Sequence, residues 1–289
     1  MQPHAVPQVV GRLALDVAYD NVRSRSLLTV REQQPPLQVV RAFTLPDGTA
    51  LAHLHNIGGG VLGGDQLELQ VKVGDRARMQ LTTTGATRVY HHRLHAPTAM
   101  QINTVYVGED GLLEYVPDAL IPFAGSRYRQ RTTVHLAAGA GLFWWETVAP
   151  GRSARGEIFA YNLLDLSLDI VAEGRPIAIE RLHLEPQQQS LGSLARMGPY
   201  RHVTTFYMCK AGVDPARWLA LETELAALAQ DLTNYQQIVW GVSTLAAHGL
   251  VVRSLSMSER MILSGLQAFW RTAKQRLYSQ EAVPPHKVY

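Results

Sequence analysis

The sequence predicts a mainly β protein of stacked or sandwiched sheets, with two α-helices in the last third of the chain. Many short segments alternate apolar and polar residues with a period of two, which is typical of strands that bury one face. Turn-forming residues separate these segments at short intervals, and only two late segments repeat apolar residues at threes and fours. Because neither a clear repeat nor a linker divides the chain, residues 1–289 are interpreted as one domain.

The strands are predicted from these alternating runs. Leu13, Leu15 and Val17 form the first run, and a turn at residues 19–21 separates it from a second run that ends at Val30. Further strands are expected, in chain order, at residues 39–43, 50–57, 67–73, 99–107, 111–116, 131–136, 141–148, 157–170, 177–184, 203–208, 238–245 and 250–255. A long loop is expected at residues 186–200, which are rich in glutamine, serine and glycine.

The two helices are predicted from their first residues and their apolar stripes. Asp214 is a good N-cap for a helix that has Pro215 at its first position. The stripe of this helix comprises Trp218, Leu221, Leu225, Leu228 and Leu232. Ser256 and Glu259 match a capping box for the second helix. The stripe of the second helix comprises Ile262, Leu266, Phe269, Trp270, Ala273 and Leu277.

Composition narrows the class of protein. The net charge of +3 on 289 residues is too mild to favour a nucleic-acid partner. Cys209 is the single cysteine, so no internal disulfide forms, and a buried, inert thiol is the simplest interpretation. No run of about 18 apolar residues is available to span a membrane, and the first residues lack the pattern of a signal peptide. A cytoplasmic location is therefore expected.

The segment at residues 56–92 carries the densest pattern in the chain. Its five glycines are Gly58, Gly59, Gly60, Gly63 and Gly64. Three of them fit the spacing of a dinucleotide fingerprint, but that fingerprint requires a helix after the glycines, and here an alternating strand follows. We therefore expect Gly59, Gly60 and Gly64 to permit a tight turn between strands, through positive φ and close backbone approach. The Asp65 side chain is expected to bond local amides at this turn.

Three acidic residues are candidates for chemistry. Asp65 lies at the glycine turn, Glu146 ends an apolar run with two tryptophans, and Glu180 precedes Arg181 in another apolar strand. An acid in such a position points to water, to a basic partner or into an internal cavity. Each acid therefore has two interpretations: a salt bridge or solvated face, or a hydrated path lined with oxygen atoms that a divalent ion crosses without being held.

Histidines offer weaker candidates for a metal site. His53 and His55 are two apart in an expected strand and so share a face, a spacing that can hold a metal. A second group comprises His91, His92 and His95. Because neither group has an adjacent cysteine or an obvious third ligand, no tight metal site is predicted. No nucleophile elbow or other catalytic motif occurs either.

Two features suggest a surface for a protein partner. Residues 150–157 concentrate Arg152, Arg155 and Glu157, which form either a tight loop stabilised by arginine or an arginine-rich contact surface. Phe269 and Trp270 lie on the apolar stripe of the second helix, which we expect to form part of an apolar partner face that makes the isolated protein poorly soluble.

Several motifs, in order, resemble those of the urease accessory protein UreD (UreH) family. They lie at residues 59–67 (Gly-Gly-x-x-x-Gly-Asp-x-Leu), 81–90 (Leu-Thr-Thr-x-x-Ala-Thr-Arg-Val-Tyr), 115–126 and 150–157 (Pro-Gly-Arg-x-Ala-x-Gly-Glu), with shorter matches at 181–184 and 252–255. Two departures are present. Ala119 stands where a second proline is common in the family, and residues 284–289 replace the usual Pro-Arg-Ile/Val-Trp ending.

The resemblance implies a mainly β fold with two helices and a maturation factor without its own catalytic site. Such proteins bind apo-urease and UreF, which recruits the GTPase UreG, and help install nickel in urease. The family is thought to pass nickel through an internal tunnel, and Asp65, Glu146 and Glu180 are the candidates here for its lining. Nickel is then cargo, not a tightly bound cofactor. The competing hypothesis is a hydrolase that uses a carboxylate pair such as Asp65 and Glu146.

Overall fold

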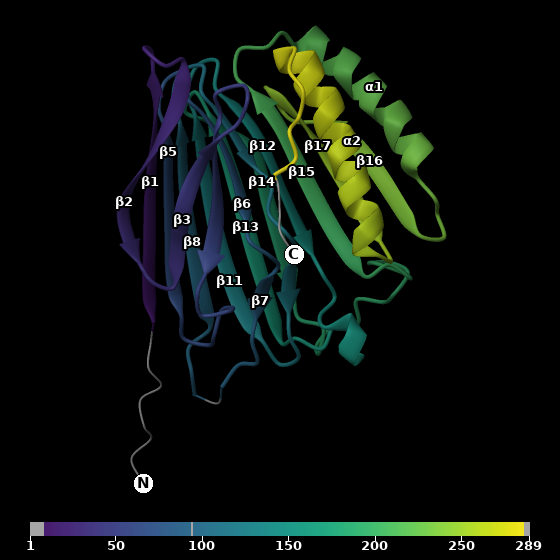
Figure 1. The fold of residues 1–289 in the computed structure, drawn as a ribbon. Coiled ribbons are helices and arrows are strands. Elements are labelled where there is room, and N and C mark those ends of the chain that lie inside the picture. Colours follow the sequence, from purple (N-terminus) through teal and green to yellow (C-terminus); the bar gives the residue numbers. More distant parts are fainter. Residues whose placement is uncertain (1–8, 94, 286–289) are drawn as a thin grey trace.

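The computed structural model describes residues 9–93 and 95–285. Two β-sheets lie face to face, and both α-helices cover the outer face of one of them (Figure 1). This architecture confirms the prediction of a mainly β protein with stacked sheets and two late helices. Residues 286–289, which hold most of the atypical C-terminal ending, lie outside the described residues.

Seven strands form the first sheet, here called sheet A. Their order across the sheet is β14 (Arg175–Leu184), β13 (Leu163–Ala172), β11 (Arg127–Leu136), β8 (Ala99–Val107), β5 (Gln66–Val73), β1 (Val10–Asp20) and β2 (Arg25–Gln34). The strands from β1 to β13 run parallel, whereas β2 and β14 are antiparallel to their neighbours at the two edges. Parallel neighbours require a crossover, so the chain leaves sheet A between them.

Ten strands form the second sheet, here called sheet B. Its main order is β16 (Ile238–Thr244), β17 (Gly249–Ser256), β15 (His202–Lys210), β12 (Gly141–Val148), β9 (Leu112–Tyr115), β6 (Arg78–Thr83), β4 (Ala50–Asn56) and β3 (Leu37–Thr44), with the short strands β7 (Thr87–Val89) and β10 (Leu120–Pro122) beside this path. The middle strands β4, β6, β9 and β12 are parallel, and hairpin partners close both ends of the sheet.

The chain coils between the two sheets, from β5 to β6, from β8 to β9 and from β11 to β12. The three turns have one form, because Ala77, Gly111 and Ala140 each donate a backbone N–H to the carbonyl three residues earlier, at 3.0, 3.0 and 3.1 Å. Neighbouring turns also bond to each other, with Leu112 N 2.9 Å from Ala77 O and Gly141 N 2.8 Å from Gly111 O. The middle of the molecule is therefore a stack of rungs.

The return connections explain why no repeat is visible in the sequence. They occupy residues 84–98, 116–126 and 149–162, and they differ in length and conformation. The last of them contains a short 3₁₀ turn, Ser153–Arg155, so the predicted strand at 157–170 was placed too early and begins only at Leu163. A stacked fold with irregular returns has structural rungs without a fixed sequence period.

Alternation identified the strands that have one wet face. In β5 every second residue, from Leu67 to Val73, is buried between the sheets, as predicted. The strand β6 was not predicted, because nearly all of its residues are buried and period-two alternation is lost when both faces of a strand are covered. The three-residue strands β7 and β10 are too short to give a pattern.

The helices α1 (Pro215–Leu232) and α2 (Glu259–Tyr278) pack on the outer face of sheet B over a second hydrophobic core. Asp214 caps α1 as predicted, since its side chain accepts a hydrogen bond from Ala216 N at 2.7 Å. The predicted capping box of α2 is wrong. Ser256 ends β17 and bonds Ser258, which is the residue before the helix. No described helix is both long enough and apolar enough to cross a bilayer.

Candidate functional site

A line of polar side chains crosses the interior between the sheets. Gln101 and Asn103 point inward from β8, and Tyr128, Gln130 and Thr132 point inward from β11. Backbone register places Gln101 beside Gln130 and Asn103 beside Thr132, so the polar positions of the two strands form adjacent rows. We call this line, together with Glu146 of β12, the polar seam.

Hydrogen bonds join the members of the polar seam. The Tyr128 hydroxyl lies 3.0 Å from Gln101 Oε1 and 3.1 Å from Gln130 Oε1, and can donate its one proton to either. Asn103 Nδ2 donates to Thr132 Oγ1 at 3.0 Å. Gln130 Nε2 donates to Glu146 Oε1 at 2.6 Å, which links sheet A to sheet B. Burying a polar group without a hydrogen bond destabilises the folded state, and here the polar groups between the sheets bond one another.

Glu146 faces a small cavity that it shares with Glu180. The inner cavity has a volume of about 40 Å³ and is lined by Glu146, Val148, Leu166, Ser167, Leu168, Glu180, Leu182, Val203 and Thr205. A single water needs roughly 10–15 Å³ of cavity volume, so several waters or a partly hydrated ion fit there. Burial raises the pKa of Glu146 to about 7, the bond from Gln130 opposes this rise, and the charge of Glu180 adds to it.

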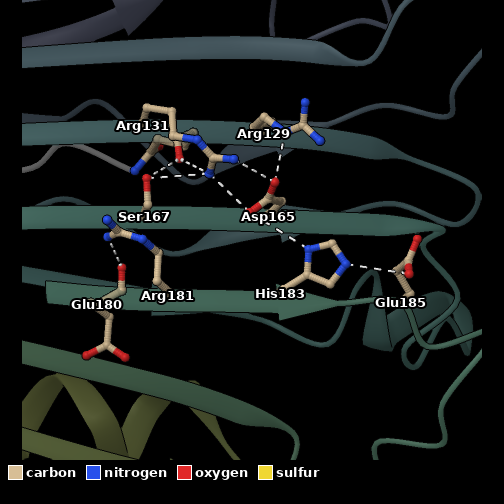
Figure 2. A network of polar contacts seen from close by, with 9 residues as sticks. Arg129, Arg131, Asp165, Ser167, Glu180, Arg181, His183 and Glu185 are labelled. Carbon is tan, nitrogen blue, oxygen red and sulfur yellow. Dashed lines mark hydrogen bonds and ion pairs between the residues drawn. The ribbon is translucent and has the colours of Figure 1, made fainter.

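Glu180 reaches the inner cavity from β14, the edge strand of sheet A. Its Oε2 accepts a hydrogen bond from the buried Tyr207 hydroxyl and lies 2.6 Å from Arg253 Nη2. The residues on either side of Glu180 face the other way. Figure 2 shows its carboxylate directed away from the cluster of charged side chains on the outer face of the sheet.

The opposite end of the polar seam opens into a larger cleft of about 220 Å³. It is lined by Leu37, Leu54, His55, Asn56, Gly59, Gly60, Val61, Thr83, Thr84, Gly85, Ala86, Thr87, Arg88, Gln101 and Tyr115. We call it the glycine–threonine cleft, because the signature glycines form one wall and the threonine run another. Gln101 belongs both to this cleft and to the polar seam, so one hydrogen-bonded line connects the cleft with the inner cavity.

The glycine turn has the geometry expected of it. Gly59 and Gly64 have φ values of +77° and +94°, and a Cβ on Gly60 would lie 2.6 Å from the carbonyl oxygen of Arg88. Asp65 Oδ2 accepts the backbone N–H of Leu62 at 2.9 Å. These contacts confirm the interpretation of the glycines and Asp65 as a tight connection between strands, here between β4 and β5.

Asp65 lies apart from the other two acids. It is 4% exposed, and burial raises its pKa while the bond from Leu62 opposes the rise. Three strands, β8, β11 and β13, separate its strand from that of Glu180, which corresponds to about 19 Å at 4.8 Å per step. The structure therefore brings two of the three candidate acids together, and places the third at the turn beside the glycine–threonine cleft.

The prediction that Phe269 and Trp270 lie on a partner surface is wrong. Phe269 and Trp270 are both fully buried, because the apolar stripe of α2 packs on sheet B within the chain's own second core. Their burial also removes the reason given for poor solubility of the isolated protein. Arg152 instead donates to Glu157 through Nε at 2.8 Å and lies over the Phe123 ring, as a tight loop stabilised by arginine requires.

The histidine candidates stay apart from any cluster of ligands. His53 packs edge-on against Phe43, with ring centroids 6.1 Å apart, while His55 lines the glycine–threonine cleft. Within residues 9–93 and 95–285, no group of three or more His, Cys, Asp and Glu side chains is placed to hold a metal ion. Cys209 is buried, which confirms that prediction and raises the pKa of its thiol.

Charged side chains cover the outer face of sheet A at β11, β13 and β14 (Figure 2). The Asp165 carboxylate accepts hydrogen bonds from Arg129 Nε at 2.8 Å and from Arg131 Nη2 at 2.8 Å. The hydrogen bonds and charges of these arginines lower the pKa of Asp165 to about 2, with Arg131 giving the larger effect. This network was not predicted, because it joins residues more than 30 positions apart whose pairing depends on strand register.

The chain is similar to known proteins over nearly its whole length. A family model described as UreD urease accessory protein matches residues 10–288. The urease accessory protein UreD of Herpetosiphon aurantiacus is 49% identical over 279 residues, which cover 96% of each chain. The proteins of the same name from Lachnoclostridium phytofermentans and Bacillus sp. strain TB-90 are each 27% identical, over 82% and 90% of this chain and 84% and 93% of their own.

Proposed function

This chain belongs to the UreD family of urease accessory proteins, and we propose that it is a scaffold that passes nickel through its polar seam to apo-urease. Membership of the family implies a role in urease maturation. The finer proposal is that the protein has no catalytic site of its own, binds apo-urease and UreF in the cytoplasm, and meets the GTPase UreG through UreF.

One observation carries the nickel proposal. The polar seam connects an open cleft with a cavity that holds two carboxylates, through side chains that offer oxygen atoms at every step. Amide, hydroxyl and carboxylate oxygens are weaker ligands for Ni²⁺ than histidine or cysteine. A path must bind an ion well enough to admit it and weakly enough to release it, and such separate oxygen groups meet that requirement.

Glu146 is the residue with the largest role in this proposal. Its pKa is about 7 and its hydrogen-bond partner Gln130 is neutral, so when the carboxylate ionises no basic side chain in the described hydrogen bonds and ion pairs neutralises its charge. A divalent cation in the inner cavity would gain from Glu146 and Glu180 together, because opposite charges attract more strongly in a medium of low dielectric constant. The lining leucines and valines limit the number of waters that accompany the ion.

The competing hydrolase hypothesis finds less support. The carboxylate pairs of glycoside hydrolases flank one bond and lie about 5–10 Å apart. Asp65 bonds Leu62 N at the start of β5, whereas Glu146 bonds Gln130 beside the inner cavity, which Asp65 does not line. We therefore propose a conduit in preference to a catalytic site.

The test is urease activation in cells whose own copy of this gene is deleted and replaced by variants. Glu146→Gln and Glu180→Gln keep size and hydrogen bonding but remove charge. Each is expected to lower the nickel content of purified urease by on the order of tenfold, the effect of about 1.4 kcal/mol per lost ion contact. Asp65→Ala is expected to act less directly, by loosening the turn beside the cleft.

The matched control is Asp169→Asn, an acid of β13 that pairs with Arg181 on the outer face. It should leave nickel content unchanged. Co-purification of UreF with each variant separates a loss of transport from a loss of assembly. Full nickel loading by the Glu146→Gln/Glu180→Gln double variant would contradict the proposed route. Normal loading in the deletion strain would contradict the maturation role itself.

A further inference from the structure

The ion pair between Arg253 and Glu180 joins the two sheets at the open side of the sandwich. Glu180 lies on β14, the edge strand of sheet A, and Arg253 lies on β17, next to the edge strand of sheet B. The distance from Arg253 Nη2 to Glu180 Oε2 is 2.6 Å, and the Tyr207 hydroxyl donates to the same oxygen. One carboxylate oxygen therefore serves both donors.

Register places Arg253 in line with the inner cavity. Glu146 of β12 pairs with Thr205 of β15, and Thr205 pairs with Arg253 of β17. Glu146, Thr205 and Glu180 all line the cavity. The side chain of Arg253 is 51% exposed, compared with 27% for that of Glu180. Arg253 is thus half exposed and has its charged end on a carboxylate of the lining.

This pairing has an electrostatic consequence for any cation in the cavity. Arg253 neutralises Glu180, and a guanidinium is protonated at every accessible pH and offers no lone pair to a metal. A divalent cation must therefore compete with the guanidinium for Glu180. The contact is made by a single nitrogen, not by the two parallel bonds of a stronger bidentate pair, so the guanidinium can be displaced.

We propose that Arg253 is a displaceable counter-ion of Glu180: it closes the inner cavity toward solvent, yields to a passing divalent cation, and expels that cation when it returns. This role rests on the proposed function and adds a cause for release. Without such a competitor, two adjacent carboxylates and a hydroxyl would release a divalent cation more slowly.

The first test compares Arg253→Gln with two variants. Arg253→Lys keeps a positive charge at the same place. Arg181→Gln removes an arginine that lies on the opposite face of β14 from Glu180, pairs with Asp169 and has a side chain that is 53% exposed. Nickel(II) binding to the full chain is measured by equilibrium dialysis, and nickel transfer is measured as metal content of urease in complemented cells. Arg253→Gln is expected to bind nickel about tenfold more tightly, equivalent to about 1.4 kcal/mol, and to deliver less of it.

The controls are expected to behave differently. Arg253→Lys should stay within about threefold of the wild-type affinity, because its charge still competes for Glu180, and Arg181→Gln should match the wild type. Equal affinity and equal delivery in Arg253→Gln and the wild type would overturn the proposal. Tighter binding in Arg181→Gln of the same size would also overturn it, because the effect would then be one of net charge.

A second measurement needs no variant and so does not depend on the folding of one. An arginine-selective dicarbonyl reagent is applied to the wild-type protein with and without nickel(II), and modification of each arginine is followed by mass spectrometry. Nickel should accelerate modification of Arg253 several-fold, because its guanidinium leaves Glu180, while Arg181 reacts at an unchanged rate. A rate at Arg253 that nickel leaves unchanged or lowers contradicts displacement.

The two proposals fail in different ways. If the Glu146→Gln/Glu180→Gln variant loads urease normally, the cavity is not the route and the proposed function is lost. If that variant fails while Arg253→Gln binds and delivers nickel like the wild type, the route stands and only the role of Arg253 is lost.

Discussion

A fully buried glutamate and a partly buried one, on neighbouring strands of sheet B, have opposite surroundings. Glu114 of β9 points outward beneath α2, where Lys274 Nζ lies 3.0 Å from its carboxylate and Trp270 Nε1 donates to it at 2.9 Å. Glu146 of β12 points inward, where it has a neutral amide partner, a second carboxylate nearby and a cavity in front of it. The fold therefore gives Glu114 a basic partner and leaves Glu146 without one.

This difference separates a structural role from a transport role. Burial raises the pKa of Glu114, and the Lys274 ammonium and the Trp270 N–H oppose that rise. Both Glu114 and Lys274 are completely buried, and neither lines any of the described cavities, so no ion or water is needed to complete the site. Glu146 has no basic partner and faces free space, and both features favour the transient binding of a cation.

The largest expected effect comes from breaking the paired acid. Lys274→Met leaves the Glu114 carboxylate buried without its cation, and removal of one partner from a buried ion pair costs about 3–5 kcal/mol of unfolding free energy. Glu114→Gln is expected to cost a similar amount, because Lys274 is then the unpaired charge. Chemical denaturation at pH 7 measures both variants.

The double variant Glu114→Gln/Lys274→Met sharpens this comparison. Replacing both members of a buried pair removes the desolvation cost as well as the attraction, so its loss of stability should be smaller than that of either single variant. Additive losses in the double variant would mean that the two residues stabilise the protein separately. Nickel loading of urease should follow stability alone in this series, because the pair lies outside the polar seam.

The fold was largely predictable from the sequence, whereas the site was only partly so. Alternation along β1 and β5 and the apolar stripe of α2 record which face of each element is buried, and burial is what periodicity reports. The same signal, applied to Gln101 and Gln130, would have marked polar residues at inward positions. Their alignment across β8 and β11 depends on register, which no local pattern contains.

The errors have the same physical origin. Phe269 and Trp270 were assigned to a partner surface because an apolar stripe shows that a face is covered but does not show by what. Glu180 was a candidate acid, yet its partners Tyr207 and Arg253 come from strands of the other sheet and are distant in sequence. Single residues that break an apolar run are visible in the sequence, but the residues that meet them are visible only in the structure.

A smaller effect, and of opposite sign, is expected at the unpaired acid. The folded-state pKa of Glu146, about 7, lies above the ordinary value of 4.5, so between these values the folded state binds more protons than the unfolded state. Stability then falls as pH rises through that window, by on the order of 3 kcal/mol. Glu146→Gln does not ionise, so it should be less stable than or equal to the wild type near pH 4.5 and more stable above pH 7.

Denaturation curves of both proteins between pH 5 and pH 8 measure this difference, which should grow with pH. Nickel(II) affinity of the wild type should rise over the same range, since a proton and a cation compete for the Glu146 carboxylate. A difference in stability that stays constant from pH 5 to pH 8 would show that Glu146 is ionised throughout. Its surroundings would then impose no penalty on the charge, and the contrast with Glu114 would be lost.

The smallest effect is expected at an acid that is paired but near solvent. Asp165 has a pKa of about 2, below its usual 3.8, because Arg131 and Arg129 bond it, so its contribution is present above pH 3.8 and is lost as pH falls through 2. Both arginine side chains are about 40% exposed, at 39% and 41%, and solvent screens their attraction. Asp165→Asn should therefore cost about 1 kcal/mol at pH 7 in low salt, and less in 1 M salt.

Denaturation at two salt concentrations checks this, with the salt-insensitive Lys274→Met as reference. A cost at Asp165 as large as that at the buried pair, and equally indifferent to salt, would mean that burial does not set the strength of these ion pairs. The contrast between Glu114 and Glu146 would then need a different cause.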